Sequence, residues 1–157
     1  MAKIYSHSRL STFEQCPLKF KYKYLDKIPE LTKSVESCLG KAVHEALEFL
    51  YREIKEKRIP SVDSLLEFYI ESWEKNYDPE TIIVNQGLTK EDYFNKGVTF
   101  LINYYKTHHP FDDNTIEVEK RIVVKLDEQN EYKVQGFIDR LVYNLEKNRY
   151  EIHDYKT

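Results

Sequence analysis

Glycine, proline, cysteine and long apolar runs are all scarce in this 157-residue sequence. With 4 Gly and 5 Pro, the chain is not expected to contain an extended flexible linker. Its two cysteines, Cys16 and Cys38, are too few for a disulfide framework. No apolar run approaches the roughly 18 residues of a membrane span, and no signal peptide opens the chain. We therefore expect a cytoplasmic protein with no membrane partner.

The composition is typical of a globular protein. Hydrophobic residues make up 41% of the chain and charged residues 32%, and the length is sufficient for one domain with its own core. We expect a single domain over residues 1–157, mainly helical over 1–110 and built of strands over 111–157.

Positive charge gathers at the N-terminus, although the net charge of the chain is −3. Residues 1–28 carry six basic and two acidic side chains. Lys19, Lys23 and Lys27 recur at a spacing that places them on one face of a helix. This face is either a solvated surface over a buried aromatic stripe or a docking surface for a polyanion. The spacing alone does not decide between the two interpretations.

Several capping patterns predict where helices begin. Ser11 followed by Glu14 is a capping-box pattern, and Pro17 then interrupts or restarts the helix. A further helix is expected after Ser61, and another begins at Thr89 with Asp92 three residues on. Before Ser61, residues 38–57 are expected to form a strongly amphipathic helix. Its predicted apolar stripe consists of Leu39, Val43, Ala46, Leu47, Leu50 and Ile54.

His44 lies beside this apolar stripe. A lone histidine in such a position is more often a packed core residue than a metal ligand. From the helix alone, both interpretations stay open.

After Pro110 the period of the sequence changes from helical to alternating. Strands are expected over 114–126, 132–144 and 149–156, separated by polar turns. This order of elements predicts an α+β fold in which N-terminal helices pack on a mainly antiparallel β-meander.

Two carboxylates are expected to meet in the last hairpin. A turn around Glu146 and Lys147 places Asp139 opposite Asp154, and directly opposed side chains lie about 5 Å apart. Alternation puts Lys156 on the same face as Asp154. The neighbours that share this face are apolar, so we expect the acids to interrupt a buried surface; these neighbours are Phe137, Leu141 and Ile152.

Neighbouring desolvated carboxylates must share a proton or receive a cation. One interpretation is a structural ion pair of Asp139 with Lys156 or Arg140. The other is an Mg²⁺ or Mn²⁺ site for attack on a phosphate, in which the carboxylates hold the ion and the lysine stabilises developing charge. Two acids and one ammonium group favour the second. Neither cysteine has an evident general base, and no serine lies in a nucleophile elbow, so covalent catalysis is not indicated.

These residues resemble the active-site signature of the PD-(D/E)xK nuclease superfamily. "GFIDR" is followed by "DYKT", and the similarity is greatest to the RecB-like exonucleases of AddAB-type and CRISPR-associated proteins. Three further stretches match this branch in order. They are "SRLSTFEQCPLKFKYKYL", "LGKAVHEALE" and "IEVEKRIVVKL". The resemblance covers nearly the whole chain and implies a restriction-endonuclease-like core.

The resemblance implies roles for individual residues. His44, Asp139 and Asp154 would bind Mg²⁺ or Mn²⁺, the backbone carbonyl of Tyr155 would complete the shell, and Lys156 would be catalytic together with the two acids. Glu119 would support the site or face solvent on its strand. DNA would approach along the basic N-terminal helix. Its proposed contacts are Arg9, Lys19, Lys23 and Lys27.

This sequence departs from the RecB-like branch in two ways, and each limits which features of the branch are expected here. Relatives continue past the lysine into a helix with a Gln-x-x-x-Tyr motif, whereas this sequence ends one residue after Lys156, so we expect a C-terminally truncated fold. In iron–sulfur members, Cys16 would be the first of four cysteine ligands, but Cys38 is the only other cysteine here. An iron–sulfur cluster is therefore not expected in this chain.

The sequence predicts a metal-dependent DNA nuclease, most simply an exonuclease of repair, recombination or defence. The alternative is a noncatalytic DNA-binding or scaffold module of a larger helicase–nuclease complex. Intact Asp139, Asp154 and Lys156 favour the enzyme, and the missing helix favours the module.

Overall fold

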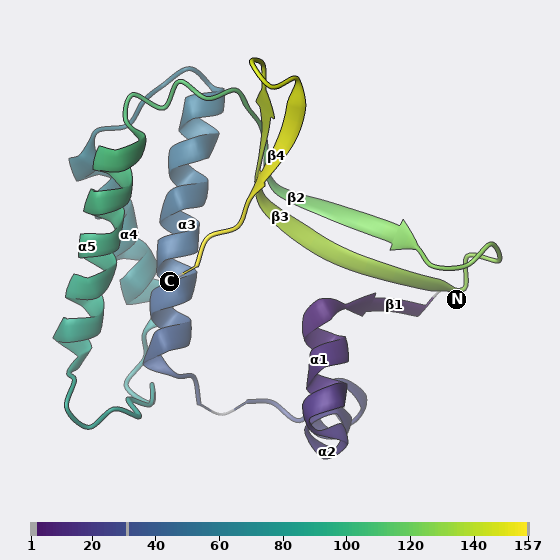
Figure 1. Cartoon of the computed structure of the whole chain (residues 1–157). Coiled ribbons are helices and arrows are strands. Elements are labelled where there is room, and N and C mark those ends of the chain that lie inside the picture. Colours follow the sequence, from purple (N-terminus) through teal and green to yellow (C-terminus); the bar gives the residue numbers. More distant parts are fainter. Residues whose placement is uncertain (1–2, 31, 157) are drawn as a thin grey trace. The chain divides into compact units, whose positions relative to one another are not determined.

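The computed structural model describes residues 3–30 and 32–156 and confirms the α+β class (Figure 1). Its elements in chain order are β1 (Lys3–Ser6), α1 (His7–Gln15), α2 (Pro17–Phe20), the π-helical segment η1 (Lys21–Leu25), α3 (Val35–Lys55), α4 (Val62–Asn76), α5 (Lys90–His108), β2 (Thr115–Lys125), β3 (Tyr132–Asn144) and β4 (Arg149–His153). Among these described residues, no helix has the length and apolar character needed to cross a membrane.

The chain divides into two compact units. One comprises residues 1–31 and 119–138, and the other comprises residues 32–118 and 139–157. We call them the N-terminal unit and the helical unit. Strands β2 and β3 each continue from one unit into the other.

The core of the helical unit is formed by α3, α4 and α5, which lie side by side (Figure 1). The predicted stripe of α3 is confirmed, because five of its six members are buried and Ile54 packs against the cluster as a partly buried residue. Tyr69 and Trp73 of α4 and Leu101 of α5 complete the packing around it. The apolar stripe of α3 therefore packs against α4 and α5 and fixes the position of the helix that carries His44.

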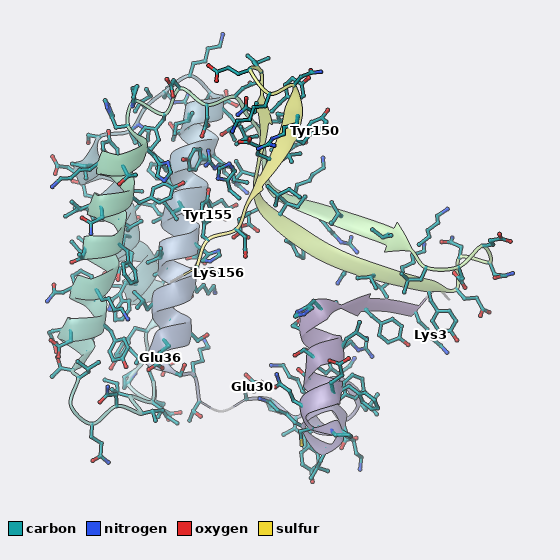
Figure 2. All side chains as sticks on the ribbon, in the orientation of Figure 1. Lys3, Glu30, Glu36, Tyr150, Tyr155 and Lys156 are labelled. Carbon is teal, nitrogen blue, oxygen red and sulfur yellow. The ribbon has the colours of Figure 1, made fainter. Side chains whose placement is uncertain are left out.

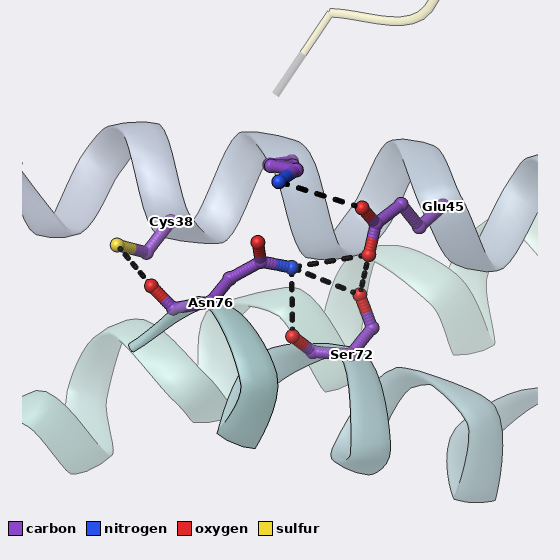
Figure 3. Close-up of polar contacts among 5 residues, drawn as sticks. Cys38, Glu45, Ser72 and Asn76 are labelled. Atoms are coloured by element: carbon purple, nitrogen blue, oxygen red, sulfur yellow. Dashed lines mark hydrogen bonds and ion pairs between the residues drawn. The ribbon is translucent and has the colours of Figure 1, made fainter. Parts of the chain in front are cut away.

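A polar network locks α3 to α4 (Figure 3). The Ser72 hydroxyl donates to the Glu45 carboxylate, and the Asn76 amide donates to the same oxygen at 3.0 Å. The Cys38 thiol, also on α3, donates to the Asn76 carbonyl oxygen at 3.4 Å. Because Glu45 directly follows His44, this network fixes the rotation of α3 next to the histidine.

Gly97 of α5 packs against Leu39 of α3 and Tyr69 of α4 with no room for a side chain. A Cβ at this position would lie 2.8 Å from Leu39 Cδ1 and 2.5 Å from Tyr69 Cζ. We expect Gly97→Ala to lower the free energy of unfolding by up to about 2 kcal/mol, since overpacking costs about 1–3 kcal/mol and alanine's helix propensity returns about 1. Urea denaturation measures the change. Gly87→Ala is the control, because its Cβ would meet no atom closer than 3.4 Å, and it should be nearly neutral.

The predicted helix starts at Ser61 and Thr89 are confirmed. Thr89 and Asp92 form a complete capping box, and the Ser61 hydroxyl accepts from the N–H of Ser64. The predicted start at Ser11 is wrong, because Ser6 caps α1 and Ser11 lies inside it. Strand β1 ends at Ser6 and the helix follows without a loop, so the first available hydroxyl takes the capping role.

Pro17 separates two short helices, as the sequence predicts. Cys16 is the C-cap of α1 and the N-cap of α2, and Pro17 occupies the first turn of α2. The segment after α2 widens into the π-helical turn η1 rather than continuing as an α-helix.

The strands form a mixed sheet with the order β1-β3-β2, and β4 also pairs with β3. The short strand β1 was not expected, and it runs parallel to β3 with Lys3 opposite Tyr132. The predicted α+β fold is confirmed, and the sheet is mixed because β1 adds a short parallel strand to it. The predicted turn register is confirmed, because β4 pairs antiparallel with β3 and Arg140 lies opposite His153.

The predicted buried face of the last hairpin is wrong. Phe137 is 60% exposed and Ile152 is 66% exposed, whereas Arg140 and Val142 on the opposite face are buried. β3 turns its alternate residues Arg140 and Val142, one of them charged, toward the interior. Of the two acids, Asp154 is 57% exposed, whereas only 12% of the Asp139 side chain is exposed.

Candidate metal centre

Asp139 is the central acid of the site and lies on β3 within the helical unit. Its side chain is only 12% exposed. Its Oδ2 accepts a hydrogen bond of 2.7 Å from the backbone N–H of Tyr155. A main-chain donor holds one carboxylate oxygen in place and leaves the remaining lone pairs available to a cation.

His44 reaches the same place from α3. Its Nδ1 lies 3.7 Å from Asp139 Oδ2, and its Nε2 lies 2.8 Å from the carbonyl oxygen of Tyr155. With a neutral imidazole, a proton on Nε2 makes this second contact a hydrogen bond and leaves Nδ1 as a lone-pair donor toward Asp139. The 3.7 Å between His44 Nδ1 and Asp139 Oδ2 is also close to the roughly 3 Å expected between two neighbouring ligand atoms that each lie about 2.1 Å from one ion.

Tyr155 joins these two residues through its backbone. Its N–H donates to Asp139 and its carbonyl oxygen contacts His44. Its ring is buried, stacks on Tyr51 and meets Tyr104 edge to face, and Figure 2 shows the segment with Tyr155 and Lys156 passing beside α3. Burial and the neighbouring Tyr104 raise the pKa of the phenol, so it stays neutral. The buried ring of Tyr155 therefore holds the segment that carries Asp154 and Lys156 against the helical unit.

Asp154 and Lys156 flank Tyr155 and point away from the core. They form an ion pair with each other, and their side chains are 57% and 83% exposed. The hydrogen bond from Lys156 lowers the pKa of Asp154, and the same bond raises the pKa of Lys156. Both groups are therefore charged at neutral pH. The ion pair considered for Asp139 with Lys156 or Arg140 is replaced by other pairs, because Lys156 pairs with Asp154 and Arg140 pairs with Asp113.

Arg140 supports the site from the buried face of the sheet. Its guanidinium is completely buried, forms an ion pair with Asp113, and lies 4.0 Å from the centroid of the Tyr51 ring. Its Nη2 lies 3.0 Å from His153 Nδ1. Arg140 directly follows Asp139, and His153 directly precedes Asp154. One side chain therefore ties together the two strand positions next to the two acids.

Sequence patterns indicate no role for this buried cluster beyond Arg140 as a partner for Asp139. Arginine is almost never fully buried without a partner, and only the fold brings Asp113, Tyr51 and His153 around it. A signal was nevertheless present: period-2 alternation places Arg140 and Val142 on one face of β3.

Glu119 belongs to the N-terminal unit and directly follows Val118 in β2. Its φ of 51° lies in the left-handed region, which non-glycine residues rarely adopt within a strand. Such a conformation re-aims a side chain relative to regular strand alternation. Its role in supporting the site stays a prediction, because Glu119 and the two residues Asp139 and His44 belong to different units.

The predicted DNA contacts lie in the N-terminal unit and differ in their surroundings. The Arg9 guanidinium lies 5.3–5.5 Å from the ring centroids of Tyr5, Phe20 and Tyr24 and therefore helps to pack this unit. Lys23 forms a 2.7 Å ion pair with Glu30.

The other two predicted contacts, Lys19 and Lys27, lie in α2 and directly after the C-cap of η1, respectively. The Lys19 N–H donates to the Sγ of exposed Cys16, which thereby caps α2. Lys27 has a φ of 52°.

The helical unit thus brings together carboxylate and carbonyl oxygens, one imidazole and one adjacent ammonium group, which are residue types that could hold a divalent cation. The chain belongs to the PD-(D/E)XK nuclease superfamily, whose family model matches residues 4–157. No curated protein and no solved structure matches it significantly. The mixed sheet and its helices fit the restriction-endonuclease-like fold of this superfamily, whose members are typically nucleases that use divalent metals and act on DNA.

Proposed function

We propose that the protein is an Mg²⁺- or Mn²⁺-dependent deoxyribonuclease of the RecB-like branch that degrades linear DNA from an end. The observation that carries this proposal is the meeting of His44, Asp139 and the Tyr155 backbone, with Asp154 and Lys156 alongside. His44, Asp139, Asp154 and the Tyr155 carbonyl hold the ion. A role in repair, recombination or defence fits an end-directed nuclease.

The residues divide the chemistry between them. A bound divalent ion supplies Lewis acidity and a nucleophilic water at neutral pH. Asp139 is held by the Tyr155 N–H, so its carboxylate needs little rearrangement to act as a ligand. Lys156 is charged, and its ammonium orients the attacking water and stabilises the charge that develops on the phosphate. Asp154 keeps this ammonium close by their ion pair.

DNA is proposed to bind along the basic segment of the N-terminal unit, through Lys19, Lys23 and Lys27. Arg9 is proposed to contribute mainly by holding the aromatic packing beneath this segment. Phosphate contacts of this kind carry no sequence information and weaken with salt.

The first test is cleavage of end-labelled linear DNA by the purified chain with and without metal. We expect cleavage in Mg²⁺ or Mn²⁺, none in EDTA, and recovery when the metal is restored, because the oxygen-rich ligand set has no other means of activating water. Closed circular DNA of the same sequence is the control for end dependence and should persist.

Calorimetric titration with Mn²⁺ separates the nuclease from the alternative. Binding of the ion together with cleavage supports the enzyme. Binding without cleavage would replace it with a noncatalytic DNA-binding or scaffold module, for which a helicase is the expected partner. Absence of binding would show that the acids are structural.

A further inference from the structure

A cleft of about 300 Å³ opens beside the two exposed charges of the site, entirely within the helical unit. Asp154, Tyr155 and Lys156 line one side of it, and α3 and α5 line the rest. The helical lining consists of Val43, Leu47, Phe100, Leu101, Asn103 and Tyr104. The cleft and the catalytic lysine therefore share a wall.

The walls have a composition that suits a flat heteroaromatic ring. Val43, Leu47 and Leu101 are buried and make an apolar floor. Phe100 and Tyr104 are half-buried aromatic residues at the same helix face, on which a ring can stack. Asn103 is exposed and offers an amide that can both donate and accept hydrogen bonds.

Positive charge adjoins this apolar space at two points. Lys156 carries an exposed ammonium on one wall, and the Lys96 ammonium lies 5.6 Å from the centroid of the Phe100 ring. A nucleotide has the complementary pattern, since its phosphate is anionic and its base is flat and weakly polar. An apolar peptide would make no use of either ammonium group.

We propose that this cleft receives an unpaired nucleobase of the nucleotide next to the scissile phosphate. This rests on the proposed nuclease function, because Lys156 and Asp154 place that phosphate at the edge of the cleft. A base within a duplex is paired and stacked, and taking it out costs a few kcal/mol. The preferred substrate is therefore single-stranded DNA or a frayed duplex end.

The binding test uses a fluorescein-labelled oligothymidylate and a spacer oligomer of equal length that has phosphates but no bases. Anisotropy is measured in EDTA to prevent cleavage. Phe100→Ala is expected to weaken binding of the oligothymidylate about tenfold, as loss of one base–aromatic stack predicts, and to leave spacer binding unchanged. Asn103→Ala should give a smaller loss in the same direction.

Matched controls come from the same helix. Phe94→Ala and Asn95→Ala remove the same atoms from α5 at positions that do not line the cleft, and neither should change the ratio of the two affinities. Thermal melting verifies that each variant is folded. If Phe100→Ala does not fold, the exposed Asn103→Ala still decides the result.

The cleavage test distinguishes this inference from the proposed function. With Mn²⁺, the wild-type chain is expected to degrade the single strand faster than a blunt duplex of the same sequence, and Phe100→Ala should remove that preference. Cleavage that is equally fast on both substrates and insensitive to Phe100→Ala would overturn the nucleobase cleft and leave the nuclease intact. Absence of all cleavage would overturn the nuclease, and the spacer comparison would then judge the cleft by itself.

Discussion

Arg140→Met is expected to lower the free energy of unfolding by about 3 kcal/mol. Removing one partner of a buried ion pair costs about 3–5 kcal/mol because the other charge is left uncompensated. The lower end applies here, since the Asp113 side chain remains 32% exposed and is partly hydrated. Methionine retains much of the apolar stem and removes the guanidinium that lies over Tyr51, so the loss reports mainly on the guanidinium.

Arg149→Met is the matched control for this measurement. Arg149 lies on the adjacent strand β4 and pairs with Glu151, but its side chain is 61% exposed. Its replacement should change stability by less than about 0.5 kcal/mol, as is usual for exposed pairs. Urea denaturation gives both values. Equal stability of Arg140→Met and wild type would show that the buried guanidinium does not hold the strands.

Arg140→Lys keeps the positive charge at this position and tests whether the shape of the guanidinium is also needed. The guanidinium uses Nη1 for Asp113 and Nη2 for His153 while its plane lies over Tyr51. One ammonium group cannot occupy both places. Arg140→Lys is therefore expected to recover only part of the stability lost in Arg140→Met.

This buried arginine explains why the last hairpin could be predicted only in part. The polar turn near Glu146 was sufficient to set the register, because a two-sided strand pattern and a short turn leave few alternatives. The choice of the buried face was wrong because Phe137 and Ile152 are apolar and Arg140 is charged. Hydrophobicity decides a face only when the charged residue on the other face has no buried partner.

The candidate site was predictable to a similar degree. The motif and register brought Asp139 next to the segment of Asp154 and Lys156, and the helix pattern placed His44 beside the core. The backbone contacts of Tyr155 depend on how the C-terminal segment packs against α3, which is a tertiary arrangement with no local signal. Strand β1 has four residues, too few for alternation to be recognised.

Asp139→Asn is expected to reduce metal-dependent cleavage about 1,000-fold, equivalent to about 4 kcal/mol of transition-state stabilisation. Asparagine keeps an oxygen that can accept from the Tyr155 N–H, so the fold and the melting temperature should be preserved. What it removes is the negative charge beside His44, and with it most of the affinity for a divalent ion. Cleavage rates and Mn²⁺ calorimetry on the same preparation measure the two effects.

Two further variants separate ligand chemistry from structure at this position. Asp139→Ala removes the acceptor as well as the charge, so it should be less stable than Asp139→Asn by about 1 kcal/mol while being equally inactive. Asp112→Asn neutralises an exposed acid outside the site and should retain wild-type cleavage. Wild-type cleavage by Asp139→Asn would remove Asp139 from the ligand set. Loss of stability and activity together in both Asp139 variants would instead assign the carboxylate to holding Tyr155, and the ion would then have to be bound without it.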